Sequence, residues 1–179
     1  AASDVYKRQG HIPHTAPFMG GGGGPGGWGC AVYVVPMDYW RIFGDSALLE
    51  KGYPAILRWL EYMDSRCENG LVVREEEGGW CLGEWCAPES EAERLPEAFV
   101  NTCFYIQGLQ ELEKIAQILD KEEPGWVKDR IRMSKKAVMD TFFDAKTGDF
   151  CGGTGAANAF ALKAGLGTTG TKENLVERY

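Results

Sequence analysis

A dense run of glycines near the start of the chain limits the possible folds more than any other feature of the sequence. Eight of the 24 glycines fall between Gly20 and Gly29. A helix or core strand does not use glycine at that density, since each one loses much conformational entropy on folding. The apolar stretch over residues 31–43 that follows predicts a buried helix. The sequence therefore predicts a glycine-rich loop leading into a helix, with Trp28 at the junction.

This run does not have the pattern of a phosphate-binding loop. A Walker loop places Lys and then Ser or Thr after its last glycine, and neither residue follows here. Two interpretations remain open, a loop that lines a ligand site and a plain surface connection. The prolines Pro13, Pro17 and Pro25, together with Trp28, favour the ligand site.

Composition bounds the class of protein. The 179 residues have the length of one domain, and 44% of them are hydrophobic, which is enough for a core. The net charge of −7, with no basic cluster, argues against nucleic acid and anionic membrane surfaces as partners. No run approaches the roughly 18 apolar residues of a membrane span. We expect neither a nucleic-acid partner nor a membrane partner.

The cysteines and histidines do not form a metal-binding pattern. The six cysteines include no CxxC pair, and only two histidines are present to complete a site. Isolated cysteines on apolar helices are typically small core residues. We therefore expect no metal and no cofactor.

The two ends look different from the middle. Residues 1–9 contain the string SDVYKRQ, which we expect to be a non-native leader. Residues 173–179 read as the start of a helix without an end signal. We expect residues 10–179 to be one incomplete domain cut from a longer protein.

Between the ends, the apolar spacing is mostly helical. We expect helices over residues 31–43, 46–51, 53–67, 96–119, 124–143 and 156–164, packed in antiparallel pairs. Residues 71–74 read as a short strand paired near Trp80, and residues 146–155 as a turn. Strands and helices do not alternate, so a doubly wound fold is excluded and a mainly α fold is predicted.

Three tryptophans lie beside glycines in loops. An indole plane stacks on the C–H face of a sugar ring, and its N–H reaches a hydroxyl. Trp28, Trp80 and Trp85 are therefore candidate sugar-binding residues. The alternative is that they simply pack the end of a helical barrel.

Two polar residues are candidates for chemistry. Hydrolysis of a glycosidic bond needs two carboxyl groups. Glu84 is a candidate for one, or a hydrogen-bond partner for a sugar hydroxyl, and no spacing picks out a second. His14 shares the glycine-rich loop and is a candidate site residue or a structural histidine. Neither histidine is paired with a cysteine for thiol catalysis.

A series of motifs resembles the catalytic domain of bacterial alpha-L-rhamnosidases of glycoside hydrolase family 78. In order, the pieces are GHIPHTAP, GGWGCAVYVVP, YWRIFGD, YPAILRWLEYM, GGWCLGEW, FVNTCFYIQGLQELEKIAQIL and GGTGAANAFAL. They cover residue 10 to about residue 167. Their order and spacing, more than any one piece, make the resemblance specific.

This resemblance implies a part of an (α/α)6 barrel, a six-hairpin glycosidase fold with a short β-hairpin insertion, with its site at one end. The implied reaction is hydrolysis of terminal alpha-L-rhamnose with inversion, by two glutamates. The family's general acid is expected before Gly10 and its general base after Tyr179. The catalytic pair is thus expected outside this chain, which alone would be inactive, and Glu84 is the candidate within it.

Sugar binding is the role that the resemblance carries over. Trp28 and Trp85 match tryptophans expected to line the rhamnose pocket. Cys30 stands where many family members have Asp, which removes a carboxylate and points to a subgroup with other aglycone preferences. Glu84 also stands where many have Asp, and it keeps the charge on a longer side chain. The resemblance implies a bacterial source and leaves the compartment open between cytoplasm and periplasm.

Alternatives are another helical-barrel glycosidase such as a fucosidase, a non-catalytic carbohydrate-binding helical domain, and a helical interaction protein without a site. Half of a closed ring of hairpins would expose apolar helix faces. We therefore expect the isolated chain to be aggregated or molten.

Overall fold

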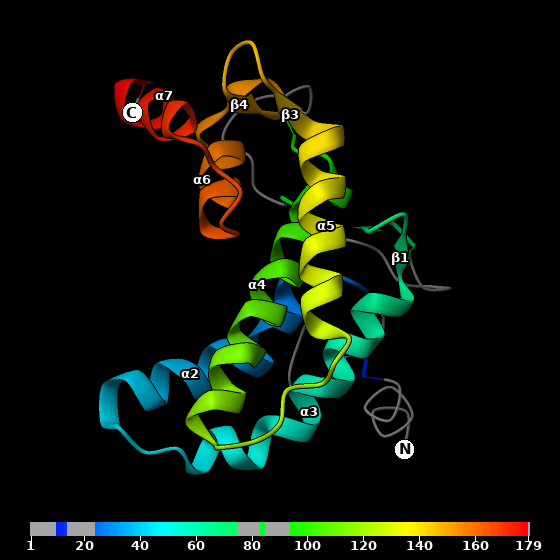
Figure 1. The fold of residues 1–179 in the computed structure, drawn as a ribbon, viewed down its shortest axis with the longest axis vertical. Coiled ribbons are helices and arrows are strands. Elements are labelled where there is room, and N and C mark those ends of the chain that lie inside the picture. The colour runs from blue at the N-terminus through cyan, green and yellow to red at the C-terminus, as the bar shows by residue number, and fades with distance from the viewer. Residues whose placement is uncertain (1–9, 14–23, 75–82, 85–93, 179) are drawn as a thin grey trace.

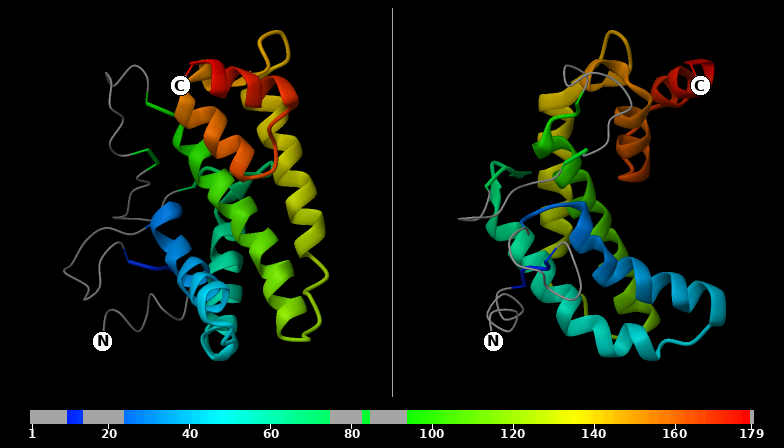
Figure 2. Two further views of the ribbon diagram at one scale, coloured as in Figure 1. Left: turned by 90° about the vertical axis from the view of Figure 1, so that its left-hand side faces the viewer. Right: turned by 180° about the vertical axis from the view of Figure 1, so that it is seen from behind.

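The computed structural model describes residues 10–13, 24–74, 83–84 and 94–178, and these are mainly helical (Figure 1). The helices are α2 (Ala31–Phe43), α3 (Ala47–Ser65), α4 (Glu97–Ile118), α5 (Val127–Phe142), α6 (Gly155–Lys163) and α7 (Thr169–Arg178). Successive helices pack as the hairpins α2–α3, α4–α5 and α6–α7. Helices α2, α4 and α6 lie on one side, with α3 and α5 on the other (Figures 1 and 2). The expected mainly α fold is confirmed.

Helix α2 has the bounds that its apolar run predicts. A short 3-10 helix, η1 (Gly27–Cys30), leads directly into it. At its end Gly44 adopts φ 70°, and its N–H donates to the Trp40 carbonyl at 2.8 Å. That left-handed conformation favours glycine, so Gly44 ends the helix as its position predicts.

Helix α3 corrects the expectation of two helices over residues 46–51 and 53–67. One helix runs through Gly52 and Pro54 without a break. The buried residues Leu49, Ile56 and Met63 recur at multiples of seven along it, so both halves pack on the same core. This shared burial outweighs the roughly 3–4 kcal/mol by which one proline and one glycine disfavour a helix interior.

A β-hairpin follows α3. Strand β2 (Leu71–Val72) pairs with β1 (Cys67–Glu68). The expected partner residues near Trp80 lie outside the described residues. Asn69 and Gly70 at the tip of the hairpin have φ values of 51° and 88°. Two positive φ values in an Asn-Gly pair are typical of a tight type I′ hairpin.

The segment expected to be a turn over residues 146–155 contains a second hairpin. Strand β3 (Phe143–Asp144) pairs with β4 (Asp149–Phe150), and the 3-10 turn η3 (Cys151–Gly153) connects β4 to α6. Helix α7 begins at Thr169, four residues before the predicted helix start at residue 173. Two-residue strands have too short a pattern to stand out in a sequence.

The core has two clusters that share α4. One is formed with α2 and α3, around Trp59 and Tyr105, and the other with β4 and α6, around Phe99 and Phe150. Helix α4 is buried along most of its length, while α5 is charged on its outer face. Among the described residues, no helix is long and apolar enough to cross a membrane.

Candidate functional site

The end of the glycine-rich segment packs tightly on the protein's own helices. A Cβ atom on Gly27 would overlap the Phe104 ring of α4, and one on Gly29 would overlap the Trp59 indole of α3. Glycine is therefore required here, because any side chain would push the segment off both helices. The close approach that the glycines permit is, for this part of the segment, an approach to α3 and α4.

Trp28 lies between these two glycines and is 51% exposed. Its neighbours on both sides are anchored, so the position of its backbone is fixed while half of its side chain faces outward. Glycine-containing segments directly precede α2 and α6, at residues 24–30 and 151–154. The expected sugar-binding role of Trp28 is compatible with this exposed, anchored position.

Glu84 helps to fix the chain at the beginning of α4. Its Oε2 accepts a hydrogen bond from the backbone N–H of Leu95 at 3.3 Å. Gly83 lies against Glu97, where an added Cβ would be 2.9 Å from the Glu97 Cγ. One Glu84 oxygen thus has a positioning contact. The other predicted site residues, His14, Trp80 and Trp85, lie outside the described residues.

Asn101 is a buried polar residue that the sequence does not single out. It is fully buried in α4 beneath Gly26, where an added Cβ would lie 2.8 Å from its Oδ1. Neither atom of its amide has a hydrogen-bond partner among the described residues. Gly26 therefore covers an amide that has no hydrogen-bond partner in the described part of the chain.

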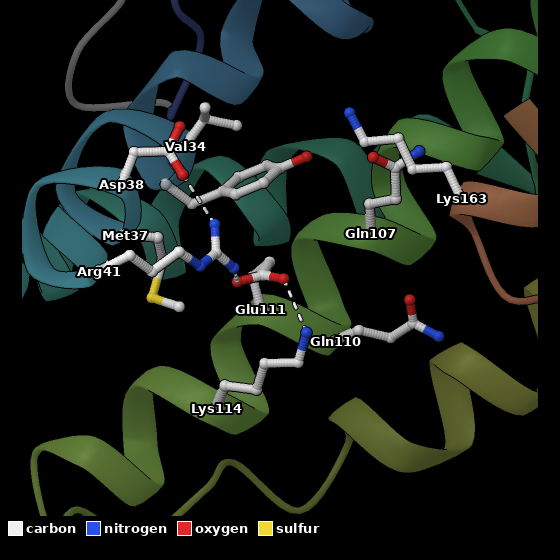
Figure 3. Close-up of a pocket in the computed structure, with 10 residues that line it drawn as sticks. Val34, Met37, Asp38, Arg41, Gln107, Gln110, Glu111, Lys114 and Lys163 are labelled. Carbon is white, nitrogen blue, oxygen red and sulfur yellow. Dashed lines mark hydrogen bonds and ion pairs between the residues drawn. The ribbon is translucent and has the colours of Figure 1, made fainter.

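A pocket of about 190 Å³ lies between α2, α4 and α6 (Figure 3). Helix α2 contributes Tyr33, Val34, Met37, Asp38 and Arg41, and α4 contributes Gln107, Gln110, Glu111 and Lys114. Lys163 of α6 completes the lining, and the Gln110 amide fastens α6 to α4 by donating to the Ala164 carbonyl at 3.3 Å. Most of the lining side chains are polar or charged, and Tyr33, Val34 and Met37 supply its apolar part.

The charged groups at one end of the pocket neutralise one another. Arg41 donates to Asp38 at 2.8 Å and to Glu111 at 2.9 Å, and Lys114 donates to Glu111 at 2.8 Å (Figure 3). The hydrogen bond to Asp38, followed by the Glu111 charge, raises the pKa of Arg41. Because Arg41 is half exposed, this network adds little to stability.

The other end of the pocket contains two unsatisfied groups. Tyr33 is 2% exposed and Gln107 is 7% exposed, yet Tyr33 Oη and Gln107 Nε2 have no hydrogen-bond partner among the described residues. Burial, with the Cys30 thiol and the Glu111 carboxylate next, raises the pKa of Tyr33, so its hydroxyl is neutral. Burial also raises the pKa of Cys30, while the nearby Lys163 charge opposes that rise.

In a second pocket, of about 140 Å³, the two charged lining groups form an ion pair with each other. The pocket lies between α5 and the first hairpin, with Asp64 and Arg130 in its lining. Asp64 Oδ1 accepts from Tyr105 Oη at 3.0 Å and pairs with Arg130 Nε at 2.7 Å. These groups hold α3, α4 and α5 together. Within the part of the chain that the structure describes, no group of histidine, cysteine, Asp or Glu residues is arranged to hold a metal ion.

Comparisons with known proteins fit this arrangement. The family model of the bacterial alpha-L-rhamnosidase six-hairpin glycosidase domain matches residues 2–179. An alpha-L-rhamnosidase of Alteromonas sp. (strain LOR) is 26% identical over 126 residues, which are 66% of this chain and 13% of that protein. An alpha-L-rhamnosidase of Formosa agariphila is 26% identical over 124 residues, 64% of this chain and 12% of that protein. The matched residues thus span about an eighth of the length of each of these relatives.

Solved structures share the fold. The alpha-L-rhamnosidase of Streptomyces avermitilis complexed with L-rhamnose aligns with a TM-score of 0.81 at 23% identity, over 98% of this chain and 17% of that one. The alpha-L-rhamnosidase of Aspergillus terreus aligns with a TM-score of 0.79 at 20% identity, over 98% of this chain and 21% of that one. The paired helices are therefore part of an (α/α)6 barrel, and the chain belongs to the bacterial alpha-L-rhamnosidase six-hairpin glycosidase family.

Proposed function

We propose that the protein carrying this segment hydrolyses terminal alpha-L-rhamnose from rhamnosides, with inversion at the anomeric carbon. The family match over residues 2–179 is the observation that carries this proposal. The relatives named alpha-L-rhamnosidases support it, as does a solved relative complexed with L-rhamnose. Carbohydrate is accordingly the proposed partner, with no cofactor.

The segment's role in this reaction is to bind the sugar. Trp28 offers a half-exposed indole on an anchored backbone, which suits stacking on a rhamnose ring. Trp80, Trp85 and His14 complete the proposed wall, and Glu84 positions the chain before α4 or accepts a sugar hydroxyl. The two catalytic carboxyl groups are proposed to come from residues outside this chain.

The test is hydrolysis by the protein encoded by the complete reading frame. We expect release of nitrophenol from the aryl alpha-L-rhamnoside and much slower release from the matched alpha-L-fucoside. Proton NMR of the first product should show the β anomer, because one water displaces the leaving group directly. If the protein does not hydrolyse the rhamnoside, the proposal is wrong. Faster hydrolysis of the fucoside would favour the alternative glycosidase. An initial product in the α form would contradict inversion.

A further inference from the structure

We propose that the pocket between α2, α4 and α6 binds one neutral sugar ring through Tyr33 and Gln107. The choice of a sugar as the ligand rests on the proposed function. The place and the residues rest on the geometry of the pocket. None of its lining residues was among the sugar-binding candidates that the sequence predicts.

The first argument for a bound ligand is that two polar groups of the pocket lack hydrogen-bond partners among the described residues. Tyr33 Oη and Gln107 Nε2 are buried in the pocket wall without a hydrogen-bond partner among the described residues. Buried polar groups in native proteins are almost always satisfied, by protein, water or ligand. The Gln107 amide can also rotate about its terminal torsion, which exchanges the nitrogen and oxygen that face the pocket.

The second argument, for a sugar ring, comes from the volume and the lining of the pocket. The volume of about 190 Å³ is many times the roughly 10–15 Å³ that a cavity needs to hold one water molecule, so the pocket has room for a larger ligand such as one sugar ring. Val34 and Met37 of α2 add apolar side chains to a lining that is otherwise mostly polar (Figure 3). A sugar ring has the matching form, with C–H groups on its faces and hydroxyl groups at its edge.

The third argument, for a neutral ligand, comes from the charged groups of the pocket. Arg41, Lys114, Asp38 and Glu111 are already paired with one another. The two unsatisfied groups are an amide and a hydroxyl whose pKa is raised by burial, so both are neutral. Lys163 also lines the pocket, but it is exposed to solvent, so water screens its charge. Neutral donors suit hydroxyl groups, which favours a neutral ring over a carboxylated sugar.

The test compares two variants of the pocket that should bind the sugar more weakly without being less stable. In the complete protein, Tyr33→Phe removes only the unsatisfied hydroxyl, and Gln107→Leu replaces the amide with an apolar group of similar size. We expect each variant to raise the dissociation constant for L-rhamnose about three- to tenfold in calorimetric titrations. Their melting temperatures should stay equal to or above that of the wild type, because removal of an unsatisfied polar group does not destabilise the free protein.

A matched control lies on the same helix. Tyr39→Phe removes a hydroxyl outside the pocket, from a ring packed 4.8 Å from Phe43, and should change neither quantity. Unchanged rhamnose binding in both pocket variants would overturn the proposal. Tighter binding of D-glucuronate than of L-rhamnose would overturn the neutral ligand. Neither binding result depends on whether the wild-type protein hydrolyses rhamnosides. Hydrolysis is the separate test of the proposed function.

Discussion

At the scale of the residue, Gly29 is fixed by the indole of Trp59, since a Cβ atom there would overlap the indole nitrogen. We predict that Gly29→Ala destabilises the protein by about 1–3 kcal/mol, because a well-packed neighbour must shift. Urea unfolding measures the difference.

Gly52 provides the contrasting control. It lies inside α3, where an added Cβ would have its nearest neighbour at 3.7 Å, an ordinary contact with Pro36 Cγ. Gly52→Ala should therefore stabilise the protein by about 0.5–1 kcal/mol, since alanine loses less entropy in a helix. Equal effects at the two positions would contradict the assignment of Gly29 to close packing.

Burial also determines thiol reactivity. It raises the pKa of Cys67, Cys103 and Cys151 from 9.0 to about 12. At pH 8 a rise of three units lowers the thiolate fraction roughly a thousandfold. Iodoacetamide should modify these thiols far more slowly in the folded protein than in urea, as followed by mass spectrometry of each peptide. Similar rates in both conditions would contradict their burial.

The same shifts predict how stability depends on pH. Because each pKa is higher in the folded state, folding favours the protonated thiol. The contribution to stability is fully present below pH 9 and is lost as the pH rises toward 12. Unfolding curves of Cys103→Ala, compared with the wild type over this range, should show a weaker decline for the variant.

At the scale of the element, a buried amide joins the second hairpin to α6. Asn158 accepts from the Phe150 N–H at 3.0 Å and donates to Asp149 at 2.8 Å. Asn158→Leu leaves both partners without this amide, so we predict a loss of about 2–4 kcal/mol in the free energy of unfolding. Asn174→Ala removes a more exposed bond to Asp149 and should lose about 1 kcal/mol. A larger loss at Asn174 would contradict this order.

Elements formed by local interactions can be predicted from the sequence, and those that depend on contacts between distant residues cannot. The bounds of α2 were readable because an apolar run ends at Gly44, a local signal. The break expected at Gly52 and Pro54 was wrong, because burial of both halves of α3 is a long-range effect. The pocket could not be predicted either, since it brings together residues more than 100 positions apart, such as Tyr33 and Lys163. The sequence shows that Trp28 lies between glycines and the structure shows that it is half exposed, while its role in sugar binding stays a prediction.

At the scale of the whole molecule, α2 is apolar on two faces. Tyr33 and Met37 face the core, while Val35 and Ile42 are 59% and 72% exposed along another face. An apolar stripe on a helix is typical of a face that packs against a neighbouring element. We expect a further helix of the six-hairpin barrel to pack on this exposed stripe.

The stripe predicts the behaviour of the 179-residue chain in isolation. We expect it to associate or to be molten, because contiguous exposed apolar surface promotes association. Ile42→Lys, which adds charge to the stripe, should lower the apparent mass in light scattering. A cooperative melt as a monomer by the unmodified chain would contradict this prediction.

The measurement that tests the account most directly is the Michaelis constant of Trp28→Ala for an aryl alpha-L-rhamnoside, in the complete protein. If Trp28 is a wall of the sugar site, the constant should rise about tenfold, with partial recovery in Trp28→Phe and no change in melting temperature. Trp40→Phe, a change in a tryptophan packed against the core, is the control and should leave the constant unchanged. A Michaelis constant unchanged by Trp28→Ala would contradict a role of the glycine-rich segment in sugar binding.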